Sequence, residues 1–424
     1  MSSKNAERIS QKAGLKTQRG TYDALILDAV LRQSLVSVRS LGSRGLHVAA
    51  SETSKHVSVP TFSSRWCQHR FICPVEEGTE HYLQHLKQML TQTGVRVVIP
   101  SSDGTIALIR KHRAELEQQT HIALAQETAL SIAVDKERTL EIAQQLGIEV
   151  PRSIVVRAMD GVAAAIHEIG LPVVIKPAES WVERGWHGAR FGAELASTLA
   201  EAQVIAEKAL SFGGNILVQP FLSGRREAVS FLYARGEMYA RFAQWAKRTE
   251  PQLGGTSVLR QSIAIPEDIG DRAERLVREI DLEGYSEVEF RRDGAGKPYL
   301  MEINPRLSAS VEIAVRSGVD FPYLLYRWAA GELIQHVHDY QKGKWMRYMR
   351  GDFFTTLEAI HQPGRVGVAP GGEAVRDFLA SFFVPMSYDY VHWQDPKPAF
   401  VSTADFIRNR VIKGITKKIE NLAG

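Results

Sequence analysis

The sequence predicts an α/β protein in which an N-terminal doubly wound parallel sheet precedes a mixed α+β region. Two patterns support this fold class. Short apolar strands alternate with helices over residues 22–118, which is typical of a parallel sheet. Farther along, helices are mixed with strands that include a pair joined by a glycine-containing loop. The length of 424 residues leaves room for two or three domains.

The N-terminal unit should begin at Tyr22. Its expected elements, strand and helix in alternation, are Ala24–Leu27, Leu31–Leu41, Leu46–Ala50, Tyr82–Thr93, Val95–Ile99 and Thr105–Gln118. The segment Pro100–Asp103 comes at the carboxyl end of a strand, where doubly wound sheets bind ligands. The same segment also suits a plain helix N-cap, and the sequence leaves both interpretations open.

The middle unit starts near His121, and its pattern is less regular. Its expected elements are the helix Ser131–Leu146, the strand Ser153–Val156, the helix Ala163–Ile169, the strand Val173–Lys176, the helix Ala196–Phe212, the strands Ile216–Pro220 and Ala228–Tyr233, and the helix Ile269–Ile280. We therefore expect a polar tail over residues 1–20, domains over 21–120 and 121–335, and an extension of unknown role over 336–424.

The composition is that of an ordinary globular protein, with 44% hydrophobic and 24% charged residues. The 52 basic and 48 acidic residues give a net charge of +4, so nucleic acid is not the expected partner. Two cysteines, Cys67 and Cys73, are too few for a disulfide framework and fit a reducing compartment. No apolar run reaches about 18 residues and no signal peptide is visible, so a cytoplasmic location is the default expectation.

The most informative stretch is Ser286–Arg306, which predicts a hairpin of two short strands. Pairing of these strands would set Glu289 beside Glu302. The same register would set Glu287 beside Asn304. Adjacent carboxylates repel unless a cation lies between them, and oxygen ligands of this kind suit Mg²⁺ with a nucleotide triphosphate. A solvated polar face on a half-buried hairpin is the alternative, which this segment alone leaves open.

Two cationic side chains fit the same chemistry. Arg306 follows the hairpin directly and has a planar fork that binds phosphate. Lys176 ends the apolar strand within Pro172–Pro177, where an ammonium group must find a charge partner because unpaired burial is costly. Arg306 therefore strengthens the prediction of a phosphate-binding site, and Lys176 is expected beside a group of opposite charge.

The order of these features resembles the ATP-grasp superfamily from about Leu25 to Gly331, with an N-terminal unit like the pre-ATP-grasp domain. The motifs that carry the resemblance are Asp135-Lys136, PVVIKP around Lys176, ESWVERGWHGAR over Glu179–Arg190, VQPFL over Val218–Leu222, Glu227 and the hairpin. The resemblance implies a two-lobed ATP-grasp domain over residues 121–335, with a small lid lobe at about 150–217.

The resemblance also implies a role for each matching residue in binding ATP. The ATP phosphates would be contacted by Lys136 and Lys176. The metal ligands, for Mg²⁺ or for Mn²⁺ in its place, would be Glu289, Glu302 and Asn304. Contacts from a flexible loop would come from Ser180, Gly185, His187 and Gly188, adenine contacts from Gln219, Phe221 and Leu222, and a ribose contact from Glu227.

Further implied positions concern catalysis and the substrates. The expected catalytic residues are Arg306, Lys176 and Arg260. The segment Trp245–Ser257 resembles a loop of amide-forming members, which would place Lys247, Arg248 and Gly254-Gly255 near phosphate or substrate. Candidate contacts to the acceptor are Ser310 and Arg316. A solvated surface loop remains the alternative for the segment Trp245–Ser257.

The implied activity is that of an ATP-dependent, ADP-forming carboxylate–amine ligase acting through an acyl phosphate. Its partners would be small carboxylate and amine substrates, without nucleic acid and without a membrane span, and a homodimer stays open. A kinase or a carboxylase on the same fold is one alternative, and a non-catalytic module that binds or senses ATP is another. The full set of charged ligands argues against the non-catalytic module.

Overall fold

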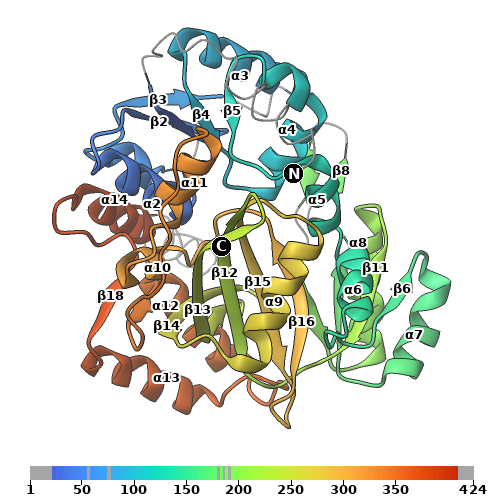
Figure 1. Ribbon diagram of the computed structural model, residues 1–424. Coiled ribbons are helices and arrows are strands. Elements are labelled where there is room, and N and C mark those ends of the chain that lie inside the picture. The colour runs from blue at the N-terminus through green and yellow to red at the C-terminus, as the bar shows by residue number, and fades with distance from the viewer. Residues whose placement is uncertain are drawn as a thin grey trace, which may run out of the picture.

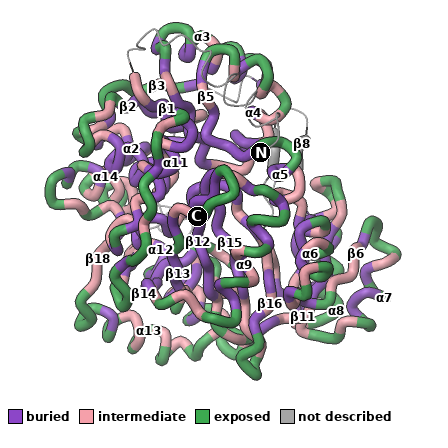
Figure 2. The backbone as a smooth tube through the Cα atoms, in the orientation of Figure 1, coloured by how far each residue is buried: buried purple, intermediate pink, exposed green. Residues whose placement is uncertain are grey.

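The computed structural model describes residues 22–54, 58–73, 78–178 and 192–408, together with the backbone of 182–184 and 187–189. An N-terminal domain lies above a large central sheet, with a small lobe on one side of that sheet and a C-terminal extension on the other (Figure 1). The strands in the centre are mostly buried, whereas the outward sides of the surrounding helices are exposed (Figure 2).

The N-terminal domain is a parallel sheet in the order β3-β2-β1-β4-β5, which confirms the predicted doubly wound sheet. Its elements are β1 (Ala24–Ile26), α2 (Arg32–Gly42), β2 (Val48–Glu52), η1 (Pro60–Ser63), β3 (His69–Ile72), α3 (Thr79–Thr93), β4 (Val97–Ile99), α4 (Asp103–Leu116) and β5 (His121–Ile122). The strands β1 and β4 are buried throughout, as expected between two helix layers. The strand order reverses between them, so their carboxyl ends open a crevice in which ligands can bind.

The helix expected over Ser131–Leu146 is in fact two helices, α5 (Glu127–Ala133) and α6 (Lys136–Gln145). Asp135 separates them, because its carboxylate accepts hydrogen bonds from the first backbone N–H groups of α6 and caps that helix. Lys136 is therefore the first residue of α6, and α6 packs against the hairpin strand β16.

The small lobe is an antiparallel sheet in the order β10-β7-β11-β6, flanked by two helices. Its elements, with the short pair β8 and β9, are β6 (Ile154–Val156), η2 (Met159–Gly161), α7 (Val162–Ile169), β7 (Val173–Pro177), β8 (Val182–Arg184), β9 (His187–Ala189), β10 (Glu194–Ala196), α8 (Leu199–Ser211) and β11 (Ile216–Pro220). Its buried apolar residues, such as Val173, Ile175 and Val218, form a cluster whose members all belong to this lobe.

The large sheet has the order β16-β15-β12-β13-β14-β17-β18. Its central elements, with the helices that cover it, are β12 (Arg226–Ala234), β13 (Glu237–Glu250), β14 (Thr256–Ile263), α9 (Glu267–Glu279), β15 (Gly284–Arg292), β16 (Pro298–Asn304), α10 (Glu312–Ser317) and α11 (Phe321–Ala329). The segment Trp245–Ser257, expected as a loop, is mostly strand, because β13 continues to Glu250 and β14 begins at Thr256. Only a short turn joins the two strands.

The C-terminal extension continues the large sheet and ties it to the N-terminal domain. Its elements are β17 (Trp345–Arg347), α12 (Met349–His361), α13 (Gly371–Ala380), η3 (Ser381–Phe383), β18 (Met386–Tyr388) and α14 (Lys397–Phe406). The strand β17 pairs with β14, and β18 pairs with β17. Asp395 of the extension accepts a hydrogen bond of 2.9 Å from Arg39 Nε of α2 and one of 2.8 Å from Ser64 Oγ. The tail expected over residues 1–20 and the end of the extension beyond residue 408 lie outside the described residues.

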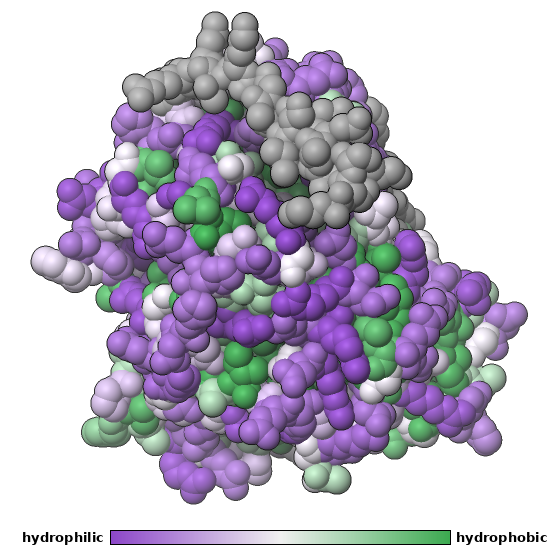
Figure 3. Space-filling view, viewed as in Figure 1, coloured by the Kyte–Doolittle hydropathy of each residue, from purple (hydrophilic) through white to green (hydrophobic). Residues whose placement is uncertain are grey.

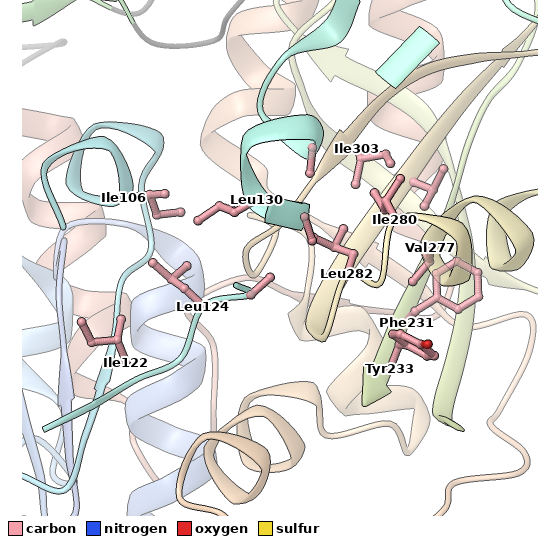
Figure 4. Packing of buried hydrophobic residues seen from close by; sticks show 14 of the residues in the cluster. Ile106, Ile122, Leu124, Leu130, Phe231, Tyr233, Val277, Ile280, Leu282 and Ile303 are labelled. Atoms are coloured by element: carbon pink, nitrogen blue, oxygen red, sulfur yellow. The ribbon is translucent and has the colours of Figure 1, made fainter. Parts of the chain in front are cut away.

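The main apolar core is shared between the N-terminal domain and the large sheet. Figure 4 shows side chains of both meeting in one cluster. The residues labelled there are Ile106, Ile122, Leu124, Leu130, Phe231, Tyr233, Val277, Ile280, Leu282 and Ile303. This common core fixes the N-terminal crevice relative to the hairpin β15–β16.

The visible surface is mostly hydrophilic (Figure 3). Hydrophilic side chains predominate on the face in Figure 3, where apolar side chains gather in separate patches. No helix among the residues described is both long and apolar enough to cross a membrane.

Candidate functional site

The hairpin β15–β16 brings three oxygen-bearing side chains together as the alternation predicted. Glu289 pairs with Glu302 across the two strands, and Glu287 pairs with Asn304. Asn304 Nδ2 lies 3.1 Å from Glu289 Oε1 and 3.5 Å from Glu302 Oε1. The predicted register of these residues is thus the one observed.

Basic side chains surround the two carboxylates. Arg226 Nε, on the neighbouring strand β12, donates to Glu289 Oε2 at 3.0 Å. Lys136 Nζ lies 3.5 Å from Glu302 Oε2. Burial alone would raise the pKa of Glu302, but the positive charges of Lys136, Lys176 and Arg226 outweigh it and hold that pKa below its usual range. Glu302 is therefore ionised at neutral pH.

Lys176, at the end of β7 in the small lobe, reaches across to the same hairpin. Its Nζ donates to the backbone carbonyl of Met301 at 3.3 Å. Burial and the neighbouring Lys136 lower the pKa of Lys176 to about 8, although Glu302 and Glu289 act in the opposite direction. The small lobe, α6 and the hairpin thus meet at one group of opposite charges.

Arg306 connects the hairpin to the N-terminal domain. Its guanidinium pairs with both carboxylate oxygens of Asp103, with 2.9 Å between Nη2 and Oδ2. Asp103 begins α4, and the hydroxyl of Ser102 caps this helix by accepting from the backbone N–H of Thr105. The segment Pro100–Asp103 is therefore a helix cap, and its last three residues also line a cavity.

This cavity has a volume of about 840 Å³ and lies between the N-terminal crevice and the hairpin. Its walls include Glu289, Glu302, Asn304 and Arg306 on one side and the loop Ser101–Thr105 on the other. The turn Gly254-Gly255 also lines it, together with Ser310. Those predicted substrate-side residues therefore do face a common space.

The hinge after β11 has two groups suited to an adenine ring. Gln219 donates from Nε2 to Ser153 Oγ at 2.6 Å, while its buried Oε1 has no hydrogen-bond partner. The backbone N–H of Phe221 already donates to the carbonyl of Pro172 at 3.1 Å. Leu222 is therefore the backbone donor that remains, and of the two expected donors Phe221 is excluded.

Glu227 does not lie on the face of the large sheet that carries Glu289 and Glu302. Glu227 pairs in register with the core residue Phe290, whereas its neighbour Ala228 pairs with Glu289, so Glu227 points to the opposite face of the sheet. Its carboxylate accepts a hydrogen bond of 2.7 Å from Arg292 Nε and lies 3.2 Å from Arg225 Nε. The ribose contact stays a prediction that this arrangement does not support.

Arg260 also lies away from the cavity, contrary to the expectation for a catalytic residue. It is fully buried in β14, and its guanidinium donates to both oxygens of Asp389, at 2.9 and 2.7 Å. Other expected contacts have partners elsewhere too. Lys247 lies 3.4 Å from Asp377, Arg248 pairs with Asp352, and Arg316 pairs with Glu312.

Several of the residues expected in the flexible loop cannot be placed. Ser180 and Gly185 lie outside the described residues. His187 and Gly188 belong to β9, whose backbone alone is described. Their contacts with ATP therefore stay predictions.

Sequence reasoning missed three residues that line the cavity. Arg226 escaped notice because only the strand register shows that it reaches Glu289. Asp28 lies two residues after β1 and has a φ of 57°, and its carboxylate accepts from Ser101 N–H at 3.0 Å. Arg32 begins α2. Asp28 could have been found as an acidic residue that follows a parallel strand. Arg32 could have been found as a cation at a helix N-terminus.

The donor set fits a magnesium ion that is completed by phosphates. Among the described residues no three His, Cys, Asp or Glu side chains gather closely enough to hold a metal by themselves. Mg²⁺ usually takes one or two carboxylates and completes its shell with water and substrate phosphates. Glu289 and Glu302 supply that kind of incomplete set, and Asn304, whose Nδ2 donates to both carboxylates here, would add its amide oxygen once its amide group is turned over.

Two family models match this chain. Residues 135–230 match the ATP-binding domain of the carbamoyl-phosphate synthase L chain. Residues 214–351 match a family described as ATP-grasp in the biosynthetic pathway with Ter operon. The first range contains both lysines of the site, and the second contains the hairpin.

Relatives and solved structures point the same way. A D-alanine–D-alanine ligase of Pseudomonas entomophila is 25% identical over 213 residues, which are 46% of this chain and 64% of that ligase. The L-amino acid ligase of Bacillus licheniformis matches with a TM-score of 0.57 and 16% identity, over 75% of this chain and 76% of the other.

A third match is the biotin carboxylase domain of the Hydrogenobacter thermophilus 2-oxoglutarate carboxylase, in complex with MgADP, ADP and bicarbonate. It matches with a TM-score of 0.62 and 15% identity, over 77% of this chain and 73% of the other. At such identities the structural likeness concerns the fold.

Proposed function

This chain belongs to the ATP-grasp superfamily, and we propose that it is an ATP-dependent, ADP-forming carboxylate–amine ligase. The observation that carries the proposal is the meeting of the acidic hairpin and Arg306 at the wall of a cavity of about 840 Å³, with Lys136 and Lys176 reaching the same hairpin from α6 and the small lobe. A module that only binds ATP would have no need of a substrate-sized space beside its metal ligands. The two amino-acid ligases among the similar proteins favour the same class of reaction.

The residues of the site have distinct tasks in this proposal. Glu289, Glu302 and Asn304 would hold Mg²⁺, which when bound supplies positive charge against the triphosphate. Lys136 and Lys176 balance the remaining phosphate charge from the side of α6 and the small lobe. Gln219 Oε1 accepts from the adenine amino group, and the backbone N–H of Leu222 donates to the ring.

The chemistry proceeds in two displacements. An oxygen of the substrate carboxylate attacks the γ-phosphorus, the bond to the β–γ bridging oxygen breaks, and ADP leaves. The neutral amine then attacks the acyl carbon, phosphate leaves with its oxygen, and the nitrogen gives up a proton. Arg306, which also pairs with Asp103, would hold the donor carboxylate and the phosphoryl oxygens, so the protein would act mainly by positioning and charge compensation.

Trapping of the acyl phosphate tests this proposal directly. The protein is incubated with MgATP and a panel of carboxylic acids in the presence of hydroxylamine, and hydroxamate and ADP are measured together. We expect hydroxamate formation that requires both ATP and one class of carboxylate. ADP release that depends on bicarbonate would favour a carboxylase, and ADP release without hydroxamate would favour a kinase. ATP binding without ADP release would leave a non-catalytic module.

A pair of variants tests whether hydroxamate formation depends on the hairpin. Glu302→Ala should abolish hydroxamate formation. Glu149→Ala is the matched control, because its carboxylate pairs with Lys297 at 2.7 Å on the surface and is 43% exposed. Full activity in Glu302→Ala would remove that residue from the site.

A further inference from the structure

The guanidinium of Arg32 stands in an unusual place. Arg32 is the first residue of α2, and the first turn of this helix has no acidic residue. A cation there meets the positive end of the helix dipole, which is unfavourable. Its side chain is nevertheless only 9% exposed, and it lines the cavity beside the hairpin. A position that is costly for stability suggests that Arg32 has a ligand.

The partner of Arg32 is already committed to another arginine. Asp389 receives hydrogen bonds on both of its oxygens from Arg260, at 2.9 and 2.7 Å. Arg32 reaches the same carboxylate through one contact only, from Nη1 at 3.2 Å. One carboxylate thus faces two guanidinium groups, so these three side chains together keep one formal positive charge. Glu250 and Arg350, which also act on Tyr348, have opposite charges and leave that sum unchanged. An anion from the cavity would neutralise the remaining charge.

Aromatic side chains of the C-terminal extension hold this guanidinium in place. Arg32 lies over the ring of Tyr348, 4.2 Å from its centroid, and Tyr348 packs against Tyr390 at 6.1 Å. Burial raises the pKa of both tyrosines, so neither supplies a negative charge. The nearby Asp28 directs its carboxylate to Ser101 N–H, Ser102 and Thr105 instead. The arginine is therefore held rigidly, with donors left for a ligand.

Arg306 and Arg32 both line the cavity but have different neighbours. Arg306 adjoins the metal hairpin, where the donor carboxylate must meet the γ-phosphate in the proposed reaction. Arg32 belongs to the N-terminal domain and the extension, where no phosphate-binding group of the hairpin is in contact with it. Building on the proposed ligase function, we infer that Arg32 binds the carboxylate of an amino acid that enters as the amine acceptor. Asp389 and Tyr348 are then positioning residues for this subsite.

The test compares amino acids with their C-terminal amides in the full-length protein. The variants are Arg32→Met and Arg32→Lys. The matched control is Arg44→Met, because Arg44 also pairs with an aspartate, Asp320 at 2.6 Å, and lies 4.6 Å from the centroid of Tyr323. In Arg32→Met we expect the KM for the acceptor amino acid to rise about 30-fold, as for loss of one charge-assisted contact. The KM for its amide and hydroxamate formation from the donor should change less than about threefold. Arg32→Lys should recover part of the loss, and the control should behave as wild type.

A binding measurement keeps the inference testable without turnover. The melting temperature is recorded with each of the common amino acids and with its amide. We expect at least one amino acid to stabilise the wild type more than its amide does, and Arg32→Met to lose that difference. Equal effects of Arg32→Met on acids and amides, loss of donor hydroxamate in that variant, or no stabilisation of the wild type by any amino acid would each overturn it. Arg32-dependent stabilisation without ADP release would instead refute the ligase proposal and with it the acceptor role, and would keep only the binding of a carboxylate by Arg32.

Discussion

Replacing Lys176 by methionine should make the protein more stable and its binding of ATP weaker. The lysine is 5% exposed, and its pKa is lowered from 10.5 to about 8, chiefly by burial and then by Lys136. A fall of that size corresponds to about 3 kcal/mol against the charged form in the folded state. Methionine keeps the apolar stem and removes the charge, but it leaves the carbonyl of Met301 without its donor, which costs about 1 kcal/mol. The free energy of unfolding at pH 7 should therefore rise by about 2 kcal/mol.

The sign can be checked by varying pH. Because the pKa of Lys176 is lower in the folded state, the unfolded chain binds more protons between about pH 8 and 10.5. The destabilisation by this charge is fully present below about pH 8 and is relieved as the pH rises through that window. The free energy of unfolding of the wild type should thus rise relative to that of Lys176→Met across this range. Near the upper end, the two values should be almost equal.

Urea titrations of both proteins at pH 7 and pH 10, followed by tryptophan fluorescence, measure these differences. Calorimetry with MgATP should show an affinity loss of about 30-fold in Lys176→Met, since a charge-assisted contact to phosphate is gone. Lys208→Met is the control, because Lys208 pairs with Glu194 on the surface and is 56% exposed. It should change stability by less than about 0.5 kcal/mol. A Lys176→Met protein that is less stable than wild type, or that binds ATP equally well, would refute the reasoning.

Three further changes test the hairpin, a buried ion-pair group of the C-terminal extension and the hinge. Glu302→Ala should abolish ADP release and keep the wild-type circular dichroism spectrum; a lost spectrum would mean that the residue is structural. Asp352→Ala should destabilise the protein by about 3–5 kcal/mol in urea, because the guanidinium groups of Arg248 and Arg347 lose their common carboxylate partner. A loss below about 1 kcal/mol would contradict this. Gly367→Ala should raise the KM for ATP, because its φ is +77° and an added Cβ would lie 2.6 Å from the Phe221 ring at the hinge. An unchanged KM would separate that contact from nucleotide binding.

The metal hairpin was predictable from the sequence because its information is local. Strand alternation and a short loop are enough to fix which side chains of β15 and β16 are neighbours. The orientation of Glu227 could not be predicted in the same way, because it depends on the pairing of β12 with β15, in which Glu227 lies opposite Phe290, 63 residues away. Arg260 was misjudged for the same kind of reason, since its partner Asp389 is separated from it by 129 residues. The break before α6 was readable, since Asp135 is a good N-cap residue.

The long strand β13 was harder to recognise for a different reason. Its last residues are charged and read as a solvent-exposed loop, but the C-terminal extension covers them. Arg248 finds Asp352 in α12, and the two residues are 104 positions apart. A charged residue can lie in a covered strand when it has a partner of opposite charge, and that partner is known only from the tertiary structure.

The shared interior in Figure 4 has a consequence for how the molecule opens and unfolds. The crevice-bearing sheet and the acidic hairpin cannot separate without exposing one continuous apolar interior, so they should lose protection from hydrogen exchange in the same step. The lobe built on β7 and β11 has an apolar cluster of its own, although Leu217 of β11 also belongs to the shared interior, so we expect this lobe to tilt more easily than the other two parts can separate. Entry and exit of nucleotide should therefore be governed by that tilt, with the acceptor's side of the cavity standing as a fixed wall.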